Sequence, residues 1–228
     1  MSVASYIIMG FALLFAITVH EAAHGWAANK LGDPTAYSLG RVTLNPIAHI
    51  DPIGTIIFPI ILVVIRSPFL FGWAKPVPVN PLNLKNPRRD TLWISAAGPA
   101  SNMSVGAISL IIIVILKIAN PNVVYFLRAN ILQMGGLSPQ GFFPLGVLAL
   151  ILYYFAYINC LLAVFNLIPI PPLDGSGILM GFLSEEAIQK YERIRPFGFL
   201  ILLALIYLGL FQIIMYPFTM IIHTIVLL

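Results

Sequence analysis

"FALLFAITVHEAAHGWAANK" (residues 11–30) starts as an apolar run and then presents a histidine, a glutamate and a second histidine within five positions. An acidic side chain at the centre of a membrane helix costs roughly 2.5–3.5 kcal/mol on insertion scales. Ionisable residues in such a helix are therefore expected to have a function. If this stretch lies in a membrane, its three polar residues should do chemistry there.

The composition of the whole chain is that of a membrane protein. Of its 228 residues, 60% are hydrophobic and only 9% are charged, whereas soluble domains carry about 25% charged residues. The formal charge is +4, but no basic patch is interleaved with aromatic residues, so we expect no nucleic-acid partner. The single cysteine, Cys160, excludes an internal disulfide and a cysteine-based zinc cluster, and we expect it to be a small core residue.

Four long apolar segments predict membrane-spanning helices. They cover about 3–28, 91–118, 141–168 and 197–228. Each contains the ~20 residues that are needed to cross ~30 Å of hydrocarbon. The last is long enough for one tilted helix, or for a helix broken near Pro217.

A fifth apolar run, 53–65, is short for a span and is typical of a re-entrant or interfacial segment. Further on, alternating valine and proline at 77–79 suit a short extended edge strand, because proline cannot donate a hydrogen bond in a central strand. We therefore predict an all-α polytopic membrane protein with about four to six transmembrane helices. A short re-entrant or β-hairpin region is expected between its first two core helices.

The distribution of Lys and Arg predicts the orientation. If 53–65 dips into the membrane and returns, ten of these residues lie on one side and only Lys117 and Arg128 on the other. If the run crosses, the split is eight to four. The positive-inside rule favours the first arrangement. It places the N-terminus outside, and residues 29–90 and 169–196 on the cytoplasmic side.

His20, Glu21 and His24 form an H-E-x-x-H motif. Helical residues four apart are separated by about 40° around the axis and ~6 Å along it, so both imidazoles can reach one tetrahedral Zn²⁺. Glu21 lies beside them, placed to reach a water molecule rather than to act as a ligand. This is the geometry of a zinc hydrolase. Since ~27 Å of helix precede His20, the motif should lie near the far end of its helix, a modest depth below the cytoplasmic surface.

A catalytic zinc needs a third protein ligand, and most of the other histidines and acids have simpler explanations. His49 lies in a turn sequence, where it can also support a ligand, and His223 reads as a polar residue at the membrane interface. Three aspartates are expected to be caps or solvated groups, and three glutamates to lie on a solvated amphipathic helix: Asp33, Asp51 and Asp90, and Glu185, Glu186 and Glu192.

Asp174 differs because its surroundings are apolar. Pro171 and Pro172 precede it and Gly175 follows it, a pattern that is typical of the start of a closely packed helix. It can therefore be a helix N-terminal cap or the third zinc ligand. We favour the ligand.

Three motifs together resemble the site-2 protease family of intramembrane zinc metalloproteases. They are "HEAAH" (20–24), "GPASN" (98–102) and "NLIPIPPLDG" (166–175). The resemblance implies that His20, His24 and Asp174 bind one Zn²⁺ per chain and that Glu21 activates water. It also implies an active site within the bilayer near its cytoplasmic face, which agrees with the orientation expected from charge.

The rest of the chain is similar to a minimal branch of that family, without a PDZ-like or CBS-like domain. Residues 1–228 are then one integral-membrane metalloprotease domain, with a catalytic core of about 3–183 and a C-terminal helix or helices at 197–228. Asn102 is a candidate contact to the substrate or transition state, or else bonds a neighbouring helix. Asn159 and Asn166 are expected to be structural.

The predicted function is zinc-dependent hydrolysis of peptide bonds in or near the transmembrane segments of membrane proteins, as in regulated intramembrane proteolysis. The expected partners are transmembrane protein or peptide substrates and the lipid bilayer, and the expected location is the plasma membrane. The Gly- and Pro-rich region 66–87 is a candidate gate for water. The alternative is a metal-binding or zinc-transport membrane protein that uses the same ligands without hydrolysis.

Overall fold

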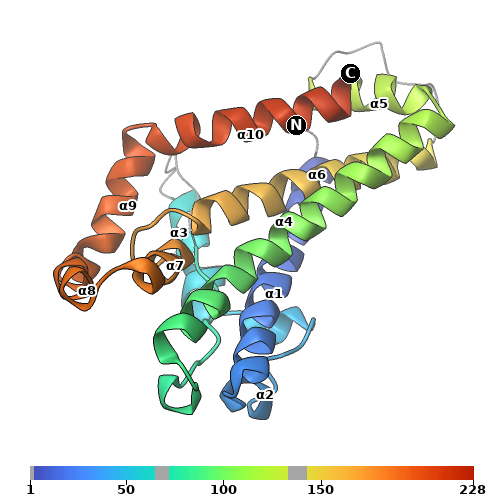
Figure 1. The fold of residues 1–228 in the computed structure, drawn as a ribbon. Helices are drawn as coiled ribbons and strands as arrows, with labels where there is room; N and C mark the ends of the chain where they lie inside the picture. The colour runs from blue at the N-terminus through green and yellow to red at the C-terminus, as the bar shows by residue number, and fades with distance from the viewer. Residues whose placement is uncertain (1–2, 65–71, 133–142) are drawn as a thin grey trace.

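Helices make up all the regular structure in the part of the chain that the computed structural model describes, residues 3–64, 72–132 and 143–228 (Figure 1). The longer helices are α1 (Val3–Leu31), α4 (Pro87–Ala119), α5 (Asn122–Ile131), α6 (Pro144–Asn166), α9 (Gly198–Tyr207) and α10 (Leu210–Leu227). The shorter ones are α2 (Thr35–Ser38), α3 (Phe58–Val64), α7 (Asp174–Phe182) and α8 (Glu185–Glu192). Single turns occur at Pro46–His49, Pro52–Ile57, Pro81–Asn83 and Arg195–Phe197.

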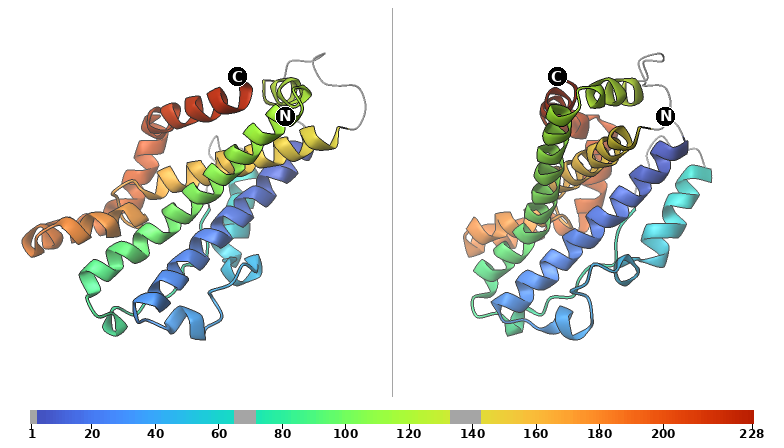
Figure 2. Two further views of the ribbon diagram at one scale, coloured as in Figure 1. Left: turned by 45° about the vertical axis from the view of Figure 1, so that its right-hand side comes forward. Right: turned by 90° about the vertical axis from the view of Figure 1, so that its right-hand side faces the viewer.

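Helices α1, α4 and α6 lie side by side and form the centre of the fold (Figures 1 and 2). Small residues allow them to approach closely: Ala12 and Ala16 on α1 are completely buried. Ile113 of α4 and Tyr153 of α6 belong to the same apolar cluster, and Cys160 is packed against it as expected. Both chain termini lie at one end of this bundle, opposite the turn that precedes α4.

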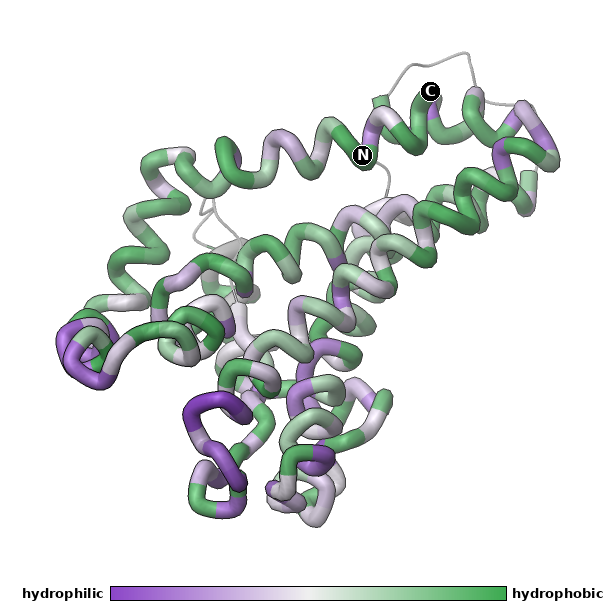
Figure 3. The backbone as a smooth tube through the Cα atoms, in the orientation of Figure 1, coloured by the Kyte–Doolittle hydropathy of each residue, from purple (hydrophilic) through white to green (hydrophobic). Residues whose placement is uncertain are grey.

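The fold is that of a polytopic membrane protein, as predicted. Among the described residues, four helices are long and apolar enough to cross a membrane: Ser5–Leu31, Pro87–Ala119, Pro144–Asn166 and Leu210–Leu227. Their outer faces carry exposed apolar side chains such as Phe11, Ile115 and Ile213, a surface suited to lipid. The hydrophilic stretches gather in the turn before α4 and over α8 (Figure 3).

The C-terminal apolar segment is broken, but not at Pro217. Pro217 lies inside α10, and the break falls at Gly209, which has a left-handed backbone conformation with φ 74°. Glycine adopts this conformation without strain, so it ends α9 and lets the chain turn before α10 begins.

The β-hairpin alternative is wrong for the part of 53–80 that the structure describes. Residues 53–64 are helical, and 72–80 are neither helix nor strand. Pro76 and Pro78 have no N–H group and cannot donate to a strand ladder. The backbone N–H of Lys75 bonds instead to the carbonyl of His49. Part of the candidate gate at 66–87 lies outside the described residues.

Candidate metal centre

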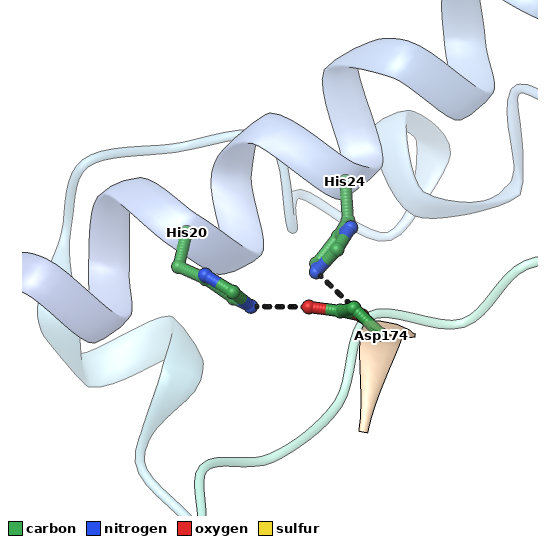
Figure 4. A group of neighbouring side chains, drawn as sticks. All are labelled: His20, His24 and Asp174. Carbon is green, nitrogen blue, oxygen red and sulfur yellow. Dashed lines mark ion pairs between the residues drawn. The ribbon is translucent and has the colours of Figure 1, made fainter. Parts of the chain in front are cut away.

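The two histidines of α1 meet Asp174, which lies about 150 residues further along the chain (Figure 4). Nε2 of His20 lies 2.9 Å from Oδ2 of Asp174, and Nε2 of His24 lies 3.3 Å from Oδ1. The two rings stand edge to face with centroids 4.6 Å apart. Spacing on one helix brings the imidazoles together, and the start of α7 supplies the carboxylate.

Gly98 allows α4 to pass directly beside these rings. A Cβ atom at this position would lie 2.4 Å from Nε2 of His24 and 2.7 Å from Cε1 of His20. Both distances are far below a normal carbon contact of about 3.5–4.0 Å. The glycine of "GPASN" is therefore required by the packing of α4 against the site.

The other ring nitrogens are held by acceptors on α4. Nδ1 of His24 lies 2.7 Å from the Ile94 carbonyl, and Nδ1 of His20 lies 2.6 Å from Oδ1 of Asn102. The Asn102 amide orientation is fixed, because its Nδ2 donates to the Ala16 carbonyl, which can only accept. Both histidines therefore donate through Nδ1 to these acceptors, which leaves each Nε2 facing Asp174.

This donor set suits a cation. Two imidazole nitrogens and a carboxylate face one another, and the ligand atoms of His20, His24 and Asp174 all lie within 4.8 Å of each other. Oδ2 of Asp174 is buried, and its ion-pair contact with His20 is the one partner that the described residues give it. Ligands of a tetrahedral zinc, at about 2.0–2.2 Å from the metal, are themselves about 3.3–3.6 Å apart. The His24–Asp174 distance of 3.3 Å lies in this range, and the His20–Asp174 distance of 2.9 Å is shorter. The residues present therefore fit Zn²⁺.

Asp174 is the first residue of α7, and its carboxylate points at the histidines rather than at the α7 backbone. Close packing holds this helix start in place. A Cβ at Gly175 would lie 2.3 Å from the Leu167 carbonyl oxygen, so only glycine fits after Asp174. The "LDG" sequence thus combines one ligand-type side chain with the residue that lets it approach α1.

Glu21 lies next to this cluster and faces a cavity of about 760 Å³. Its Oε2 accepts a 3.0 Å hydrogen bond from the backbone N–H of Val77. His20, His24 and Asp174 line the same cavity, together with apolar side chains from several elements: Ile17, Trp73, Leu162, Phe165, Phe199 and Leu202. Glu21 is therefore in the position expected of a group that reaches water beside His20, His24 and Asp174.

Asn102 is completely buried and does not line this cavity. Its oxygen faces His20, and its nitrogen donates to Ala16 and, at 2.8 Å, to Oδ1 of Asn159. Asn159 in turn donates to the carbonyl of Phe155. This geometry favours a role in orienting His20 over the substrate contact considered from the sequence.

Among the other candidates, Asp51 and Asp90 cap helical turns as expected, by accepting from the backbone N–H groups of Gly54 and Asn86. Asp33 is completely buried rather than solvated, and it accepts from the backbone N–H of Thr35 at the start of α2, as a capping group does. His49 is also buried, and its Nε2 contacts the Thr43 carbonyl at 3.0 Å rather than the metal centre.

Nε2 of His223 pairs with the hydroxyl of Tyr153 at 3.2 Å. The glutamates Glu185 and Glu192 begin and end α8, which has no buried residue. None of these three side chains lines the cavity.

Sequence reasoning missed two backbone groups at the site, the carbonyl of Ile94 and the N–H of Val77. Every residue type has a backbone carbonyl, and all but proline have a backbone N–H. The sequence therefore gives no sign of which of these groups will contact the site.

Comparisons with known proteins identify the family of this chain. A model of peptidase family M50 matches residues 8–208. The chain belongs to peptidase family M50. This M50 peptidase is 33% identical over 205 residues to a Bacillus subtilis (strain 168) protein named "Putative zinc metalloprotease YwhC", covering 90% of this chain and 82% of the relative.

A second relative is "Putative zinc metalloprotease Rip2" of Mycolicibacterium smegmatis (strain ATCC 700084 / mc(2)155). It is 26% identical over 193 residues, which cover 85% of this chain and 64% of the relative. No solved structure gives a significant match. Family membership makes the protein a zinc metalloprotease of the membrane.

Proposed function

We propose that this M50 peptidase is an intramembrane endopeptidase that hydrolyses peptide bonds in or near the transmembrane segments of membrane proteins. The observation that carries the proposal is the buried cluster of His20, His24 and Asp174 with Glu21 beside it. This cluster lies among α1, α4, α6 and α7, three of which can cross a membrane.

His20, His24 and Asp174 would hold one Zn²⁺ per chain. When bound there, zinc would supply Lewis acidity, which polarises a carbonyl oxygen and acidifies water. The protein's own part is to orient the ligands. Asn102 and the Ile94 carbonyl fix the ring planes and leave each Nε2 free to coordinate.

Glu21 would be the general base and then the general acid. Its carboxylate takes a proton from the attacking water as the new C–O bond forms at the scissile carbonyl. The same proton passes to the amine nitrogen as the C–N bond breaks, so that water is consumed and no other reactant is needed. The Val77 N–H holds this carboxylate on the cavity side of α1.

The substrate would be a transmembrane segment that unwinds locally, because a helix engages its carbonyls in hydrogen bonds. The apolar walls of the cavity suit such a segment, with Leu162 and Phe165 on α6 and Phe199 and Leu202 on α9. Ala74, Pro76, Val77 and Val79 line the same cavity, and their segment offers a backbone edge to an unwound strand.

The active site would face the cytoplasm, and the protein would lie in the plasma membrane. Lys85 precedes α4 near the site, whereas Asn122 starts α5 at the opposite end of the bundle. In a variant without Cys160, an impermeant thiol reagent added to intact cells should label a cysteine at 122 and spare one at 85. Labelling of position 85 alone would contradict this orientation.

A cleavage assay tests the proposal. The purified protein is loaded with zinc in detergent and incubated with a membrane-spanning test substrate. Wild type should cleave it, and Glu21→Gln should bind the same amount of zinc but cleave at most a trace. Equal cleavage by both would refute the mechanism, and zinc flux in liposomes without cleavage would favour a transporter.

A further inference from the structure

Residues 73–80, called the 73–80 segment below, have no regular structure, yet their backbone is fixed at several points. The N–H of Lys75 donates to the carbonyl of His49 at 3.0 Å, and the N–H of Asn80 donates to Oδ2 of Asp33 at 2.7 Å. The partners at His49 and Asp33 are both buried residues. The segment is therefore held in one path beside α1.

Arg41 provides a third anchor, and it does so from an unusually buried position. Arg41 is only 7% exposed. Its Nη2 donates to the Lys75 carbonyl at 2.5 Å and approaches the Pro76 carbonyl at 3.4 Å. Its Nε has no partner among the described residues. Burying a guanidinium is costly, so these two carbonyls are the main interaction that the buried charge gains.

The Pro76–Val77 peptide connects Arg41 to Glu21. Its carbonyl oxygen faces Arg41, and its N–H donates to Oε2 of Glu21 at 3.0 Å. In a planar trans peptide these two groups point in opposite directions, so the cation and the carboxylate lie on opposite edges of the segment. A cation at the carbonyl also strengthens the N–H as a donor, because hydrogen bonds along one peptide polarise each other.

The segment can approach Glu21 closely because Gly25 follows one helical turn later. A Cβ at Gly25 would lie 3.0 Å from Cγ2 of Val42 and 3.3 Å from Cγ1 of Val77. The face of α1 that carries Glu21 is thus shaped to receive Val77, with Val42 beside it.

We propose that Arg41 is a positioning residue for peptide hydrolysis: by holding the Lys75 and Pro76 carbonyls, it fixes the Val77 N–H that orients the Glu21 carboxylate. This inference rests on the proposed role of Glu21 as the base. Arg41 touches neither the metal ligands nor the cavity. Its loss should therefore lower turnover and leave metal binding intact.

The experiment compares Arg41→Met with Arg128→Met in the full-length protein. Arg128 is a matched control, because it also donates to a carbonyl, that of Leu227 at 2.8 Å, but does so away from the site. Arg41→Met should keep wild-type zinc content and a KM within about twofold, and its kcat should fall about 10- to 100-fold, as for a misplaced reacting group. Arg128→Met should keep the wild-type kcat.

Two further readouts separate positioning from general damage. Hydrogen–deuterium exchange should show faster exchange of the Val77 amide in Arg41→Met, which is resolvable because Pro76 and Pro78 carry no amide hydrogen. In Glu21→Asp the shorter side chain withdraws from Val77. In a double-mutant cycle of this variant with Arg41→Met, the two losses of kcat should therefore not add. Arg41→Lys should restore part of kcat, since it keeps the charge and a donor.

The inference is overturned if Arg41→Met has wild-type kcat, if its effect adds fully to that of Glu21→Asp, or if Val77 exchanges at the wild-type rate. Should Arg41→Met not fold, Arg41→Gln carries the same expectations. The exchange readout needs no substrate. If Glu21→Gln cleaves as well as wild type, the proposed function fails, while Val77 exchange still reports whether Arg41 holds the peptide.

Discussion

Replacing Gly98 by alanine should impair zinc binding more than it impairs folding. The new methyl would lie 2.4 Å from Nε2 of His24, about 1 Å inside a normal contact. The rings cannot move away freely, because His20 is held by Asn102 and His24 by Ile94. Overpacking of this kind costs about 1–3 kcal/mol. If zinc must restore the ring positions against that strain, its affinity falls about 5- to 150-fold, at about 1.4 kcal/mol per tenfold change.

Gly106→Ala is the matched control. It lies on α4 two turns further along, and its Cβ would meet no atom closer than 3.5 Å, the Ala156 carbonyl oxygen. Both substitutions gain about 0.5–1 kcal/mol of helix stability. Chelator competition on the purified variants, with melting curves to confirm folding, measures the zinc affinities. If folded Gly98→Ala binds zinc as tightly as Gly106→Ala, the described packing around the histidines is wrong.

Two further substitutions test the residues around the site. Asn102→Leu removes the acceptor of His20 Nδ1 and should weaken zinc binding by about 10- to 100-fold in the same competition assay; wild-type affinity would exclude the orienting role. Burial alone would raise the pKa of Asp33, but hydrogen bonds from Thr35, Asn83 and Asn80 lower it below its usual 3.8. The folded protein therefore gains the full stabilisation from ionised Asp33 well above pH 3.8. This stabilisation is lost as the pH falls through the lowered pKa. The melting-temperature gap between wild type and Asp33→Asn should accordingly shrink between about pH 6 and about pH 3, and a constant gap would refute the assignment.

The spans were predictable because each is a long apolar run with few charges, and the bilayer leaves little choice of structure for such a run. Helical spacing also brought His20 and His24 together in advance. Asp174 stood out because a carboxylate between apolar residues needs a partner. These inferences depend on local sequence, which one chain displays directly.

What the sequence did not reveal depends on contacts between distant segments. Arg41 and Asp33 look like solvated loop residues until the 73–80 segment is seen to cover them. The break before α10 fell at Gly209 rather than at Pro217, because α10 accommodates its proline while the glycine adopts a left-handed conformation. A single sequence does not rank these two helix breakers.

The central claim, that His20, His24 and Asp174 hold one zinc ion, is tested most directly by the zinc content of purified protein. Elemental analysis should find one zinc per chain in wild type. The same content is expected in Asp51→Ala, a control that removes a capping carboxylate away from the cavity. Asp174→Ala should fall towards zero. A folded Asp174→Ala protein that keeps one zinc per chain would contradict the account.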